Sequence, residues 1–338
     1  MSKKVALIKG DGVGPELSEG TLKVMEAAGT ETTFIECEGG AEWWEREGGD
    51  TLIPEATWEV LKNADACFKG PTTTPGGEGT PKSVAVSIRQ AFDLYANVRP
   101  IRSFPNTNAP LGPVNFLCIR EATEGFYYAA EEEITDEVLI SIRKITVPAC
   151  RKIARFAYEE ARRRKWKTVV AIHKSNILKR TCGAFLKAVE EVGKEYEDIE
   201  LWTSHVDDIA QQLIKNPQQF NEKVLLSTNL FMDILSEECA GLIGSIGVVY
   251  SANIGDTYAM FEPAHGSAAK YKGQDRVNPT ATLLSGAWLL SYLGEREKSA
   301  RIFRAVEEVI AEGNVTYDLG GSARTSEMID AVVERVSE

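Results

Sequence analysis

Two carboxylates stand four residues apart in the stretch 229–238, at Asp233 and Glu237. On a helix, side chains at this spacing project from one face about one turn apart, while Phe231, Ile234 and Leu235 point elsewhere, toward packing. Two carboxylates placed in this way can share one hard divalent cation such as Mg²⁺ or Mn²⁺. An isolated pair is more often a solvated acidic face, so the metal hypothesis depends on the residues that accompany it.

Three arginines, Arg89, Arg99 and Arg120, fall around the segment 93–97 and the apolar stretch 115–119. A guanidinium group binds a carboxylate through two parallel hydrogen bonds, so three of them on converging elements can hold a di- or tricarboxylate. Each arginine taken singly is better explained by a surface ion pair. Arg120 is the most informative, because it ends an apolar strand-like stretch, where a charge needs a partner.

Lys174 follows the apolar stretch 168–172, which predicts a strand. Ligand crevices in α/β folds open at the carboxyl ends of strands, so Lys174 is a candidate site residue, with a solvated lysine as the alternative. The preceding His173 is interpreted as a packed structural histidine. Asp207 opens a predicted helix, and it either caps that helix or serves as a third carboxylate beside the acidic pair.

A glycine-rich turn follows the first strand-like stretch at Gly10, Gly12 and Gly14. The dinucleotide fingerprint G-x-G-x-x-G requires its third glycine at position 15, where the chain has Pro15. We therefore predict a turn that feeds a proline-started helix and not a Rossmann site. A second loop, 70–77, is rich in glycine and hydroxyl groups, and it is either a plain surface loop or one that approaches a phosphate or a nicotinamide.

Strand-like and helix-like stretches alternate along the chain, which predicts a layered α/β architecture. The amphipathic stretch 146–164 predicts a helix with one apolar stripe. The uncharged run 277–294 begins with Asn278 and Pro279, which predicts a capped core helix, because a membrane span is longer and more uniformly apolar. The predicted strands are 5–8, 32–37, 66–69, 115–119, 168–172 and 200–204, and further helices are predicted from 15 to about 28 and over 55–63, 83–90, 297–311 and 325–336.

Composition restricts the functional class. The chain has 338 residues, enough for about two domains, and its net charge of −12 argues against nucleic acid as a partner. Six cysteines lie far apart without a C-x-x-C pair, which predicts reduced, mostly buried thiols and a cytoplasmic location. No secretory signal is expected, because the first four residues run directly into a strand-like stretch.

The strings DLYANVRP at 93–100 and SANIGD at 251–256 resemble those of the β-decarboxylating dehydrogenases that act on isocitrate, isopropylmalate and homoisocitrate. The resemblance extends from the turn at 10–16 to the segment 315–321. It implies an α/β isocitrate/isopropylmalate dehydrogenase-like fold, with two α/β domains, a central mixed sheet and a non-Rossmann nucleotide site. Residues 1–97 plus 247–338 are expected to form the large, nucleotide-binding domain and residues 98–246 the small, dimerisation and metal-binding domain, in a homodimer with shared active sites.

The resemblance also implies roles for individual residues. The three arginines would bind the malate carboxylates of the substrate, together with Ser83 and Asn176. Asp233, and Asp207 from the partner subunit, would bind Mg²⁺ or Mn²⁺, and Glu237 departs from the aspartate usual at its position, which puts its direct binding in doubt. Tyr127 and the partner subunit's Lys174 would be the acid–base residues. The nicotinamide cofactor would contact Thr73, Thr74, Gln211, Gln212, Glu262, His265, Gly266, Ser267, Ala268, Lys270, Tyr271, Val277, Asn278, Tyr317 and Asp318.

These residue types suit oxidative decarboxylation. A secondary alcohol loses its hydroxyl proton more readily beside a cation, and the enolate left by loss of CO₂ is stabilised by the same charge. A positioned Tyr127 can protonate that enolate at carbon, and Lys174 can act as a base where its surroundings shift its pKa.

The segment before Arg89 governs substrate choice in the family that the chain resembles. Ser83 matches a serine that hydrogen-bonds the third carboxylate of isocitrate, whereas Ala85 replaces an asparagine often found there. Isopropylmalate members carry leucines near Ala85 and Val86, and these smaller residues form a poor isopropyl pocket. We expect isocitrate as the substrate, with homoisocitrate as the main alternative and isopropylmalate or another malate as a third.

For the cofactor, Lys270 and Tyr271 replace the acidic and aliphatic pair of NAD-using relatives, which favours the 2′-phosphate of NADP. Tyr317, Gln211 and Gln212 match further NADP positions, but the arginine expected beyond them is replaced by Gly321. The expected activity is therefore that of an NADP-dependent isocitrate dehydrogenase of the tricarboxylic acid cycle. Two alternatives from other classes are a non-catalytic regulatory subunit and a metal-dependent reaction without a nucleotide, such as an aldol cleavage.

Overall fold

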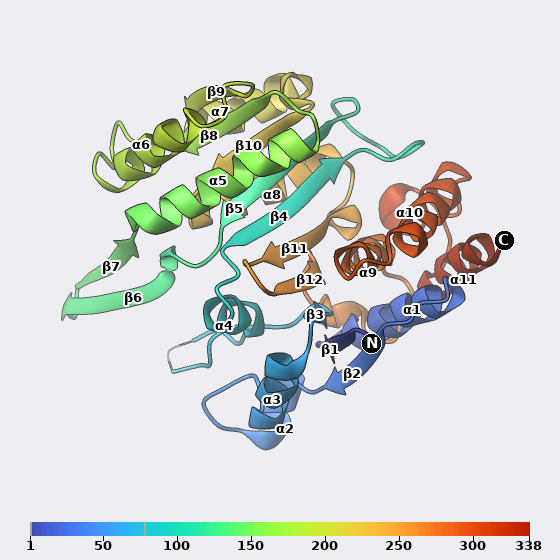
Figure 1. Cartoon of the computed structure of the whole chain (residues 1–338). Helices are drawn as coiled ribbons and strands as arrows, with labels where there is room; N and C mark the ends of the chain where they lie inside the picture. Colours follow the sequence, from blue (N-terminus) through green and yellow to red (C-terminus); the bar gives the residue numbers. More distant parts are fainter. Residues whose placement is uncertain (1, 78) are drawn as a thin grey trace.

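The computed structural model describes residues 2–77 and 79–338, which fold into alternating strands and helices (Figure 1). The strands are β1 (Lys4–Ile8), β2 (Thr33–Cys37), β3 (Ala66–Lys69), β4 (Ala96–Arg102), β5 (Asn115–Glu121), β6 (Gly125–Thr135), β7 (Val138–Lys144), β8 (Thr168–His173), β9 (Glu200–His205), β10 (Lys223–Ser227), β11 (Tyr250–Ile254) and β12 (Ala259–Pro263). The α-helices are α1 (Gly14–Ala27), α2 (Ala41–Glu47), α3 (Glu55–Asn63), α4 (Val84–Ala91), α5 (Val147–Arg163), α6 (Thr181–Gly193), α7 (Val206–Lys215), α8 (Asn229–Leu242), α9 (Thr280–Tyr292), α10 (Arg296–Ala311) and α11 (Thr325–Ser337).

A single ten-stranded sheet, in the order β2-β1-β3-β12-β11-β4-β5-β10-β8-β9, passes through the molecule. Its two ends are parallel, whereas the central pairs β12–β11, β11–β4 and β4–β5 are antiparallel. The predicted α/β fold with a central mixed sheet is thus confirmed. The five strands at one end come from 1–97 and 247–338, but the sheet is continuous, so the division into two domains stays a prediction.

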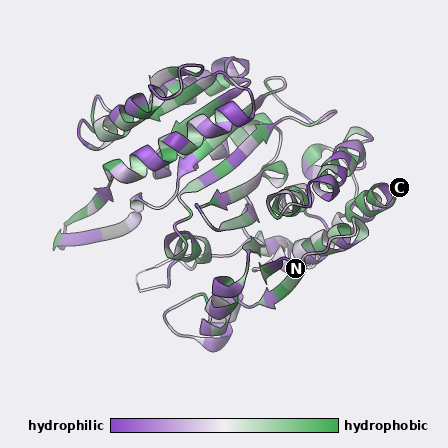
Figure 2. Ribbon diagram, in the orientation of Figure 1, coloured by the Kyte–Doolittle hydropathy of each residue, from purple (hydrophilic) through white to green (hydrophobic). Residues whose placement is uncertain are grey.

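Helices cover both faces of the sheet. The largest core cluster joins α1, α9, α10 and α11 to α7 and α8 on one face, and two smaller clusters lie under α5 and α6 and under α3 and α4. Helix α5 is amphipathic as predicted: Ile153, Ala157 and Ala161 are buried, and Figure 2 shows hydrophilic residues on its outward side. Helix α9, from the uncharged run, is almost entirely buried, which confirms a core helix.

The first turn confirms the proline-started helix. Helix α1 begins at Gly14 with Pro15 in its first turn, where the missing N–H of proline has no helical partner to lose. Gly12 adopts a φ of 60°, and a Cβ there would overlap the carbonyl oxygen of Ser267. The glycine therefore lets the turn approach the loop after β12, and Val13 donates its backbone N–H to Ser267 at 3.0 Å.

Strands β6 and β7 form a separate two-stranded arm that extends away from the main sheet (Figure 1). Its described side chains include exposed Ile134, Val138, Leu139, Ile140 and Ile142. An isolated hairpin is marginally stable in water, and a row of exposed apolar side chains is typical of a surface that contacts another chain.

All six cysteines are free and buried, as the sequence predicts. Among the helices of the described residues, none combines the length and the apolar character that crossing a membrane requires.

Candidate active site

A cavity of about 300 Å³ opens where β3, β4, β5 and β12 meet the helices α4 and α8. It is lined by Lys69, Thr72, Thr74, Ser83, Ala85, Val86, Arg89, Arg99, Arg120, Tyr127, Asp233, Ser251, Glu262, Pro263, Ala264, His265 and Gly266. We refer to it as the substrate cavity. Four of these side chains are cations and two are carboxylates, so the cavity favours an anionic ligand.

The structure brings Arg89, Arg99 and Arg120 together from three elements, and all three are buried. Strands β4 and β5 pair antiparallel, with Arg99 opposite Cys118 and Arg120 opposite Asn97, so both guanidinium groups reach the same region. Each is held in place by hydrogen bonds, because a buried charge without partners is costly. Three positioned forks of this kind suit a ligand with several carboxylates.

Arg120 has the most constrained surroundings of the three. Its Nε donates to Asn229 Oδ1 at 2.7 Å, its Nη1 contacts the Asp233 carboxylate, and its buried Nη2 has no hydrogen-bond partner among the described residues. Burial, and then the nearby Arg89, lower the pKa of Arg120 to about 10, so it remains charged at neutral pH. A buried donor without a partner beside a cavity fits a carboxylate ligand.

Tyr127 donates a hydrogen bond from its hydroxyl to Asp233 Oδ2 at 2.6 Å. Its ring also stacks on the Arg120 guanidinium, whose Cζ lies 4.7 Å from the ring centroid. Burial raises the pKa of Tyr127, and the hydrogen bond to Asp233 adds to this effect while Arg120 opposes it. The phenol therefore keeps its proton at neutral pH and can act as a proton donor.

Glu237 lies beside the substrate cavity and not in its lining. It accepts a hydrogen bond from Arg99 Nη1 at 2.6 Å, and its side chain is 49% exposed. Helix α8 does place Asp233 and Glu237 on one face, as the spacing predicts, but both carboxylates are used by arginines of this chain.

Lys69 is a cavity residue that the sequence reasoning missed. Its Nζ lies 2.8 Å from Glu262 Oε2, with both side chains almost fully buried. Glu262 also pairs with Arg89 at 3.0 Å. Burial alone would raise the pKa of Glu262, but Lys69 and Arg89 outweigh it and lower this pKa to about 2. Lys69 ends an apolar strand, the same signal that identified Lys174, and that signal could have found it.

Ser83 begins helix α4 and points into the substrate cavity. Its Oγ accepts a hydrogen bond from the backbone N–H of Val86 at 3.1 Å, which caps the helix. The hydroxyl proton remains available to a ligand carboxylate, and the neighbouring Ala85 and Val86 are small.

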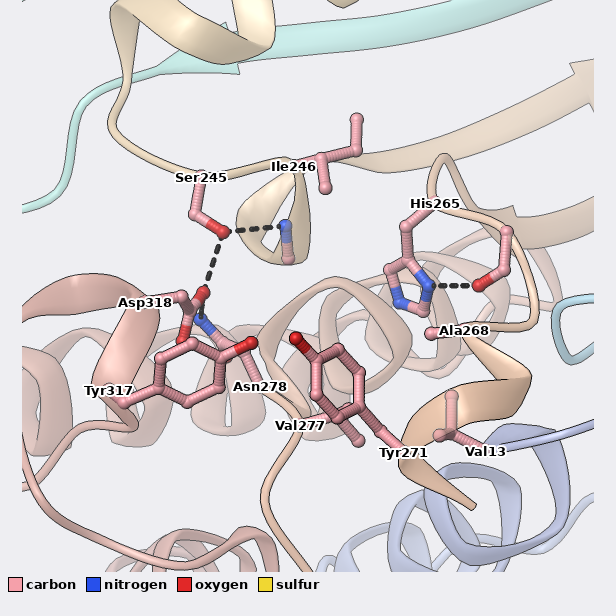
Figure 3. A pocket seen from close by; sticks show the side chains of 12 residues that line it. Val13, Ser245, Ile246, His265, Ala268, Tyr271, Val277, Asn278, Tyr317 and Asp318 are labelled. Carbon is pink, nitrogen blue, oxygen red and sulfur yellow. Dashed lines mark hydrogen bonds between the residues drawn. The ribbon is translucent and has the colours of Figure 1, made fainter.

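A second cavity of about 300 Å³ adjoins the first through His265 and Gly266, which line both (Figure 3). We refer to it as the nucleotide cavity. Its lining is mostly apolar, with a few polar groups, which is typical of a cofactor site. The lining residues are Val13, Ser245, Ile246, Gly247, His265, Gly266, Ala268, Tyr271, Val277, Asn278, Tyr317 and Asp318.

His265 contributes a buried polar atom that suits a ligand. Its Nδ1 lies 2.9 Å from the Gly266 carbonyl oxygen, and its buried Nε2 has no partner among the described residues. Burial lowers the pKa of His265, so the ring is neutral and Nε2 accepts a hydrogen bond when Nδ1 donates. This free atom fits the edge of a bound nucleotide base.

Several predicted cofactor residues lie elsewhere. Glu262 lines the substrate cavity and not the nucleotide cavity, because β12 pairs with β3 and delivers the carboxylate to Lys69. Thr73 and Ser267 line neither cavity, and their hydroxyl oxygens lie 2.6 Å apart in a contact between the two loops. Thr74 lines the substrate cavity, and Lys270 lies at the rim of the nucleotide cavity, with its Nζ 4.8 Å from the Tyr271 ring centroid.

Gln211 and Gln212 line neither cavity of this chain, and their contact with the cofactor stays a prediction. Both are on α7, which packs on α8 and the edge strand β9, and Gln212 Oε1 accepts a hydrogen bond from Gln219 at 3.2 Å. Asn176 is exposed and also lies outside both cavities.

Lys174 and Asp207 pair with each other outside the substrate cavity, with Lys174 Nζ 2.5 Å from Asp207 Oδ1. Among the described residues of one chain, no group of three acidic, histidine or cysteine side chains forms a metal site. Asp233 lines the substrate cavity of its own chain, whereas Asp207 does not. His173 is buried and accepts a hydrogen bond from the backbone of Ser175, which agrees with a structural role.

Comparisons with known proteins agree with this geometry. A family model described as isocitrate/isopropylmalate dehydrogenase matches residues 4–332. A 3-isopropylmalate/3-methylmalate dehydrogenase of Methanocaldococcus jannaschii is 40% identical over 99% of both chains. An isocitrate/homoisocitrate dehydrogenase of Thermus thermophilus is 41% identical over 99% of this chain and 98% of the relative. The mitochondrial subunit alpha of an NAD isocitrate dehydrogenase of Homo sapiens is 39% identical over 99% of this chain and 90% of the relative.

The crystal structure of isocitrate dehydrogenase from Methylococcus capsulatus superposes with a TM-score of 0.95 and 43% identity over 100% of both chains. The match thus extends over nearly the whole sequence and over the fold. The chain belongs to the isocitrate/isopropylmalate dehydrogenase family of decarboxylating dehydrogenases, whose members use a nicotinamide cofactor and a divalent metal ion.

Proposed function

We propose that this chain oxidises isocitrate to 2-oxoglutarate and CO₂ while it reduces NADP, with Mg²⁺ or Mn²⁺ bound. The observation that carries the proposal is the excess of cations in the substrate cavity, where Arg89, Arg99, Arg120 and Lys69 are all buried. The four cations and two carboxylates leave a net charge of +2, which becomes +4 with the proposed divalent cation, so three substrate carboxylates offset it more completely than two. The buried Nη2 of Arg120, which has no hydrogen-bond partner in the described part of the chain, is one donor that such a ligand would satisfy.

The choice among hydroxy acids depends on the region around Ser83. A third carboxylate can accept from the Ser83 hydroxyl and lie near Lys69, whereas an isopropyl group would leave buried polar groups without partners. This argument favours isocitrate over 3-isopropylmalate. Homoisocitrate is the second candidate, because Ala85 and Val86 are small and leave space for one more methylene group.

In this proposal the arginines hold the carboxylates, and Tyr127 donates a proton to the carbon that loses CO₂. Asp233 and the partner subunit's Asp207 would hold the cation, with Glu237 positioned by Arg99. The cation supplies positive charge at the substrate hydroxyl and at the developing enolate. The partner subunit's Lys174 would accept the hydroxyl proton.

The nucleotide would occupy the cavity next to the substrate, with its base near the free Nε2 of His265. Lys270, Tyr271 and Tyr317 favour NADP over NAD, because a cation and two hydroxyl groups suit a phosphate better than a bare ribose hydroxyl. A cytoplasmic homodimer is part of the same proposal, supported by the exposed apolar arm and by exposed Ile214 on α7 and Ile234 on α8.

The test is a panel of isocitrate, homoisocitrate, 3-isopropylmalate and malate, each assayed with NADP and with NAD. We expect the highest kcat/KM for isocitrate with NADP, and we expect chelator to abolish turnover and Mg²⁺ or Mn²⁺ to restore it. A clear preference for 3-isopropylmalate, or for NAD, would reject that part of the proposal. Absence of turnover with every pair would favour a regulatory subunit.

A further inference from the structure

Arg276 lies beside two tyrosines of the nucleotide cavity. Its guanidinium Cζ is 4.2 Å from the ring centroid of Tyr317 and 5.7 Å from that of Tyr271. The hydroxyl groups of these tyrosines point toward one another in Figure 3. A hydrogen bond between the two tyrosines, and then the cations Lys270 and Arg276, lower the pKa of Tyr271. Two cations and two phenols therefore gather at one rim of the cavity.

The backbone around Arg276 is fixed by its two neighbours. The Asp275 carboxylate accepts from the backbone N–H of Ser326 at 2.7 Å and from its hydroxyl at 2.6 Å. On the other side, Thr325 donates its hydroxyl proton to the Val277 carbonyl at 2.6 Å. Both anchors lie at the start of α11. Arg276 is the exposed residue between them, so its side chain is presented from an anchored segment.

The guanidinium group of Arg276 is available to a ligand. Within residues 2–77 and 79–338 it forms no ion pair with a carboxylate, and its neighbour Asp275 accepts two hydrogen bonds from Ser326. Stacking on Tyr317 uses the face of the guanidinium plane and leaves its N–H donors, which lie in that plane, free. Such a group binds phosphate in a bidentate manner.

Gly321 replaces the arginine expected in an NADP-using member of the family, and position 321 cannot supply the positive charge of that arginine. A Cβ at Gly321 would overlap the backbone carbonyl of Val315, and the Gly321 N–H is used by the Thr316 carbonyl at 3.1 Å. An arginine at this position would require the backbone to move. Arg276, whose guanidinium stacks on Tyr317 and forms no ion pair within the described residues, can supply the charge that position 321 does not.

We propose that Arg276 determines cofactor choice by binding the 2′-phosphate of NADP, together with Lys270, Tyr271 and Tyr317. The inference rests on the proposed use of NADP and adds a residue that the sequence pattern did not identify. The expected ligand class is a 2′-phosphorylated adenosine. The site should distinguish nucleotides by the charge on the ribose, and not by the identity of the base.

The test compares adenosine 2′,5′-bisphosphate with adenosine 5′-monophosphate, which differ only in the 2′-phosphate. Binding to the full chain is measured by calorimetry at low ionic strength, because salt screens exposed charges. We expect the wild type to prefer the bisphosphate, and Arg276→Gln to lose about 10- to 100-fold of affinity for it, as expected for one charge-assisted hydrogen-bonded contact. Affinity for the monophosphate should not change.

Two further variants sharpen the result. Arg276→Lys keeps the positive charge but loses the planar guanidinium group. Its affinity for the bisphosphate should therefore lie between that of the wild type and that of Arg276→Gln. Arg304 is an exposed arginine on α10 that does not line the nucleotide cavity. The control variant Arg304→Gln removes one positive charge there and should leave the affinities for both nucleotides unchanged. In steady-state kinetics, the ratio of kcat/KM for NADP to kcat/KM for NAD should decrease from the wild type to Arg276→Lys and then to Arg276→Gln. Arg304→Gln should keep the wild-type ratio.

The outcomes separate the two proposals. If the wild type binds both nucleotides equally, the assignment of NADP fails, and the role of Arg276 fails with it. If the wild type prefers the bisphosphate and Arg276→Gln keeps that preference, the assignment of NADP stands and the role of Arg276 is wrong. Equal losses for both nucleotides would show that Arg276 only maintains the loop, which also overturns the inference.

Discussion

Arg120 illustrates what one residue contributes to the substrate cavity. Its side chain is buried, two of its nitrogens are held by Asn229 and Asp233, and the third has no partner among the described residues. A lysine in its place would have one charged nitrogen and could not reproduce this fork. The position is therefore sensitive to geometry even when the charge is kept.

We predict that Arg120→Lys lowers kcat/KM for the hydroxy acid by about 10- to 100-fold, because a charge-assisted hydrogen bond and its geometry are lost. The measurement is initial-rate kinetics at saturating nucleotide. Arg102→Lys provides the control, since Arg102 pairs with Glu307 outside both cavities and should leave kcat/KM unchanged. An Arg120→Lys variant with wild-type kinetics would mean that the substrate does not contact this guanidinium.

Elements from distant parts of the chain meet at the ion pairs of Glu262. This residue is the last but one of β12, Lys69 ends β3, and Arg89 lies on α4, so one carboxylate links two strands and a helix beneath the cavity. Since the pKa of Glu262 is lowered to about 2 from an ordinary value of 4.5, its ionised form stabilises the fold. This contribution is complete above pH 4.5 and is lost as the pH falls toward 2.

We predict that Glu262→Gln lowers the free energy of unfolding at neutral pH by about 3–5 kcal/mol, because two buried cations lose their partner. The difference from the wild type should narrow below pH 4.5. Urea denaturation at a series of pH values measures both effects. Glu307→Gln, which removes a partly exposed partner of Arg102, should cost less than about 1 kcal/mol. A pH-independent difference would show that the Glu262 charge does not stabilise the fold.

At the scale of the whole molecule, one chain holds only part of the proposed machinery. Tyr127 and Asp233 line the substrate cavity, whereas Lys174 and Asp207 pair with each other outside it. The arm of β6 and β7 exposes a row of apolar side chains. A homodimer that covers the arm and brings Lys174 and Asp207 to the other subunit's cavity would account for both features.

Subunit complementation tests this arrangement. We predict that Tyr127→Phe and Lys174→Met each lose nearly all activity as homodimers, since each removes an acid–base group from both sites. A heterodimer of the two variants, purified through two different tags, has one intact site and should recover about half of the wild-type activity. If the heterodimer stays inactive, Tyr127 and Lys174 act within one chain or do not act together.

The sequence by itself determined the local structure and the residue types of the site. Hydrophobic periodicity and caps follow from neighbouring residues, so α3 and β3 match their predicted bounds and α1 has the predicted Pro15 in its first turn. The three arginines, Ser83, Tyr127 and Asp233 were also identified in advance, from their residue types and from the family that the chain resembles, and all line one cavity.

Tertiary structure decided which distant residues meet. The order of strands in the sheet depends on packing across the whole core, which local periodicity does not encode, so the pairing of Lys69 with Glu262 emerged only when β3 was found beside β12. The same reason explains Arg276, whose position beside Tyr317 depends on how two loops pack against α11. The sequence was sufficient to identify the chemical groups of the site, whereas the packing of the sheet and its loops determined which groups contact one another.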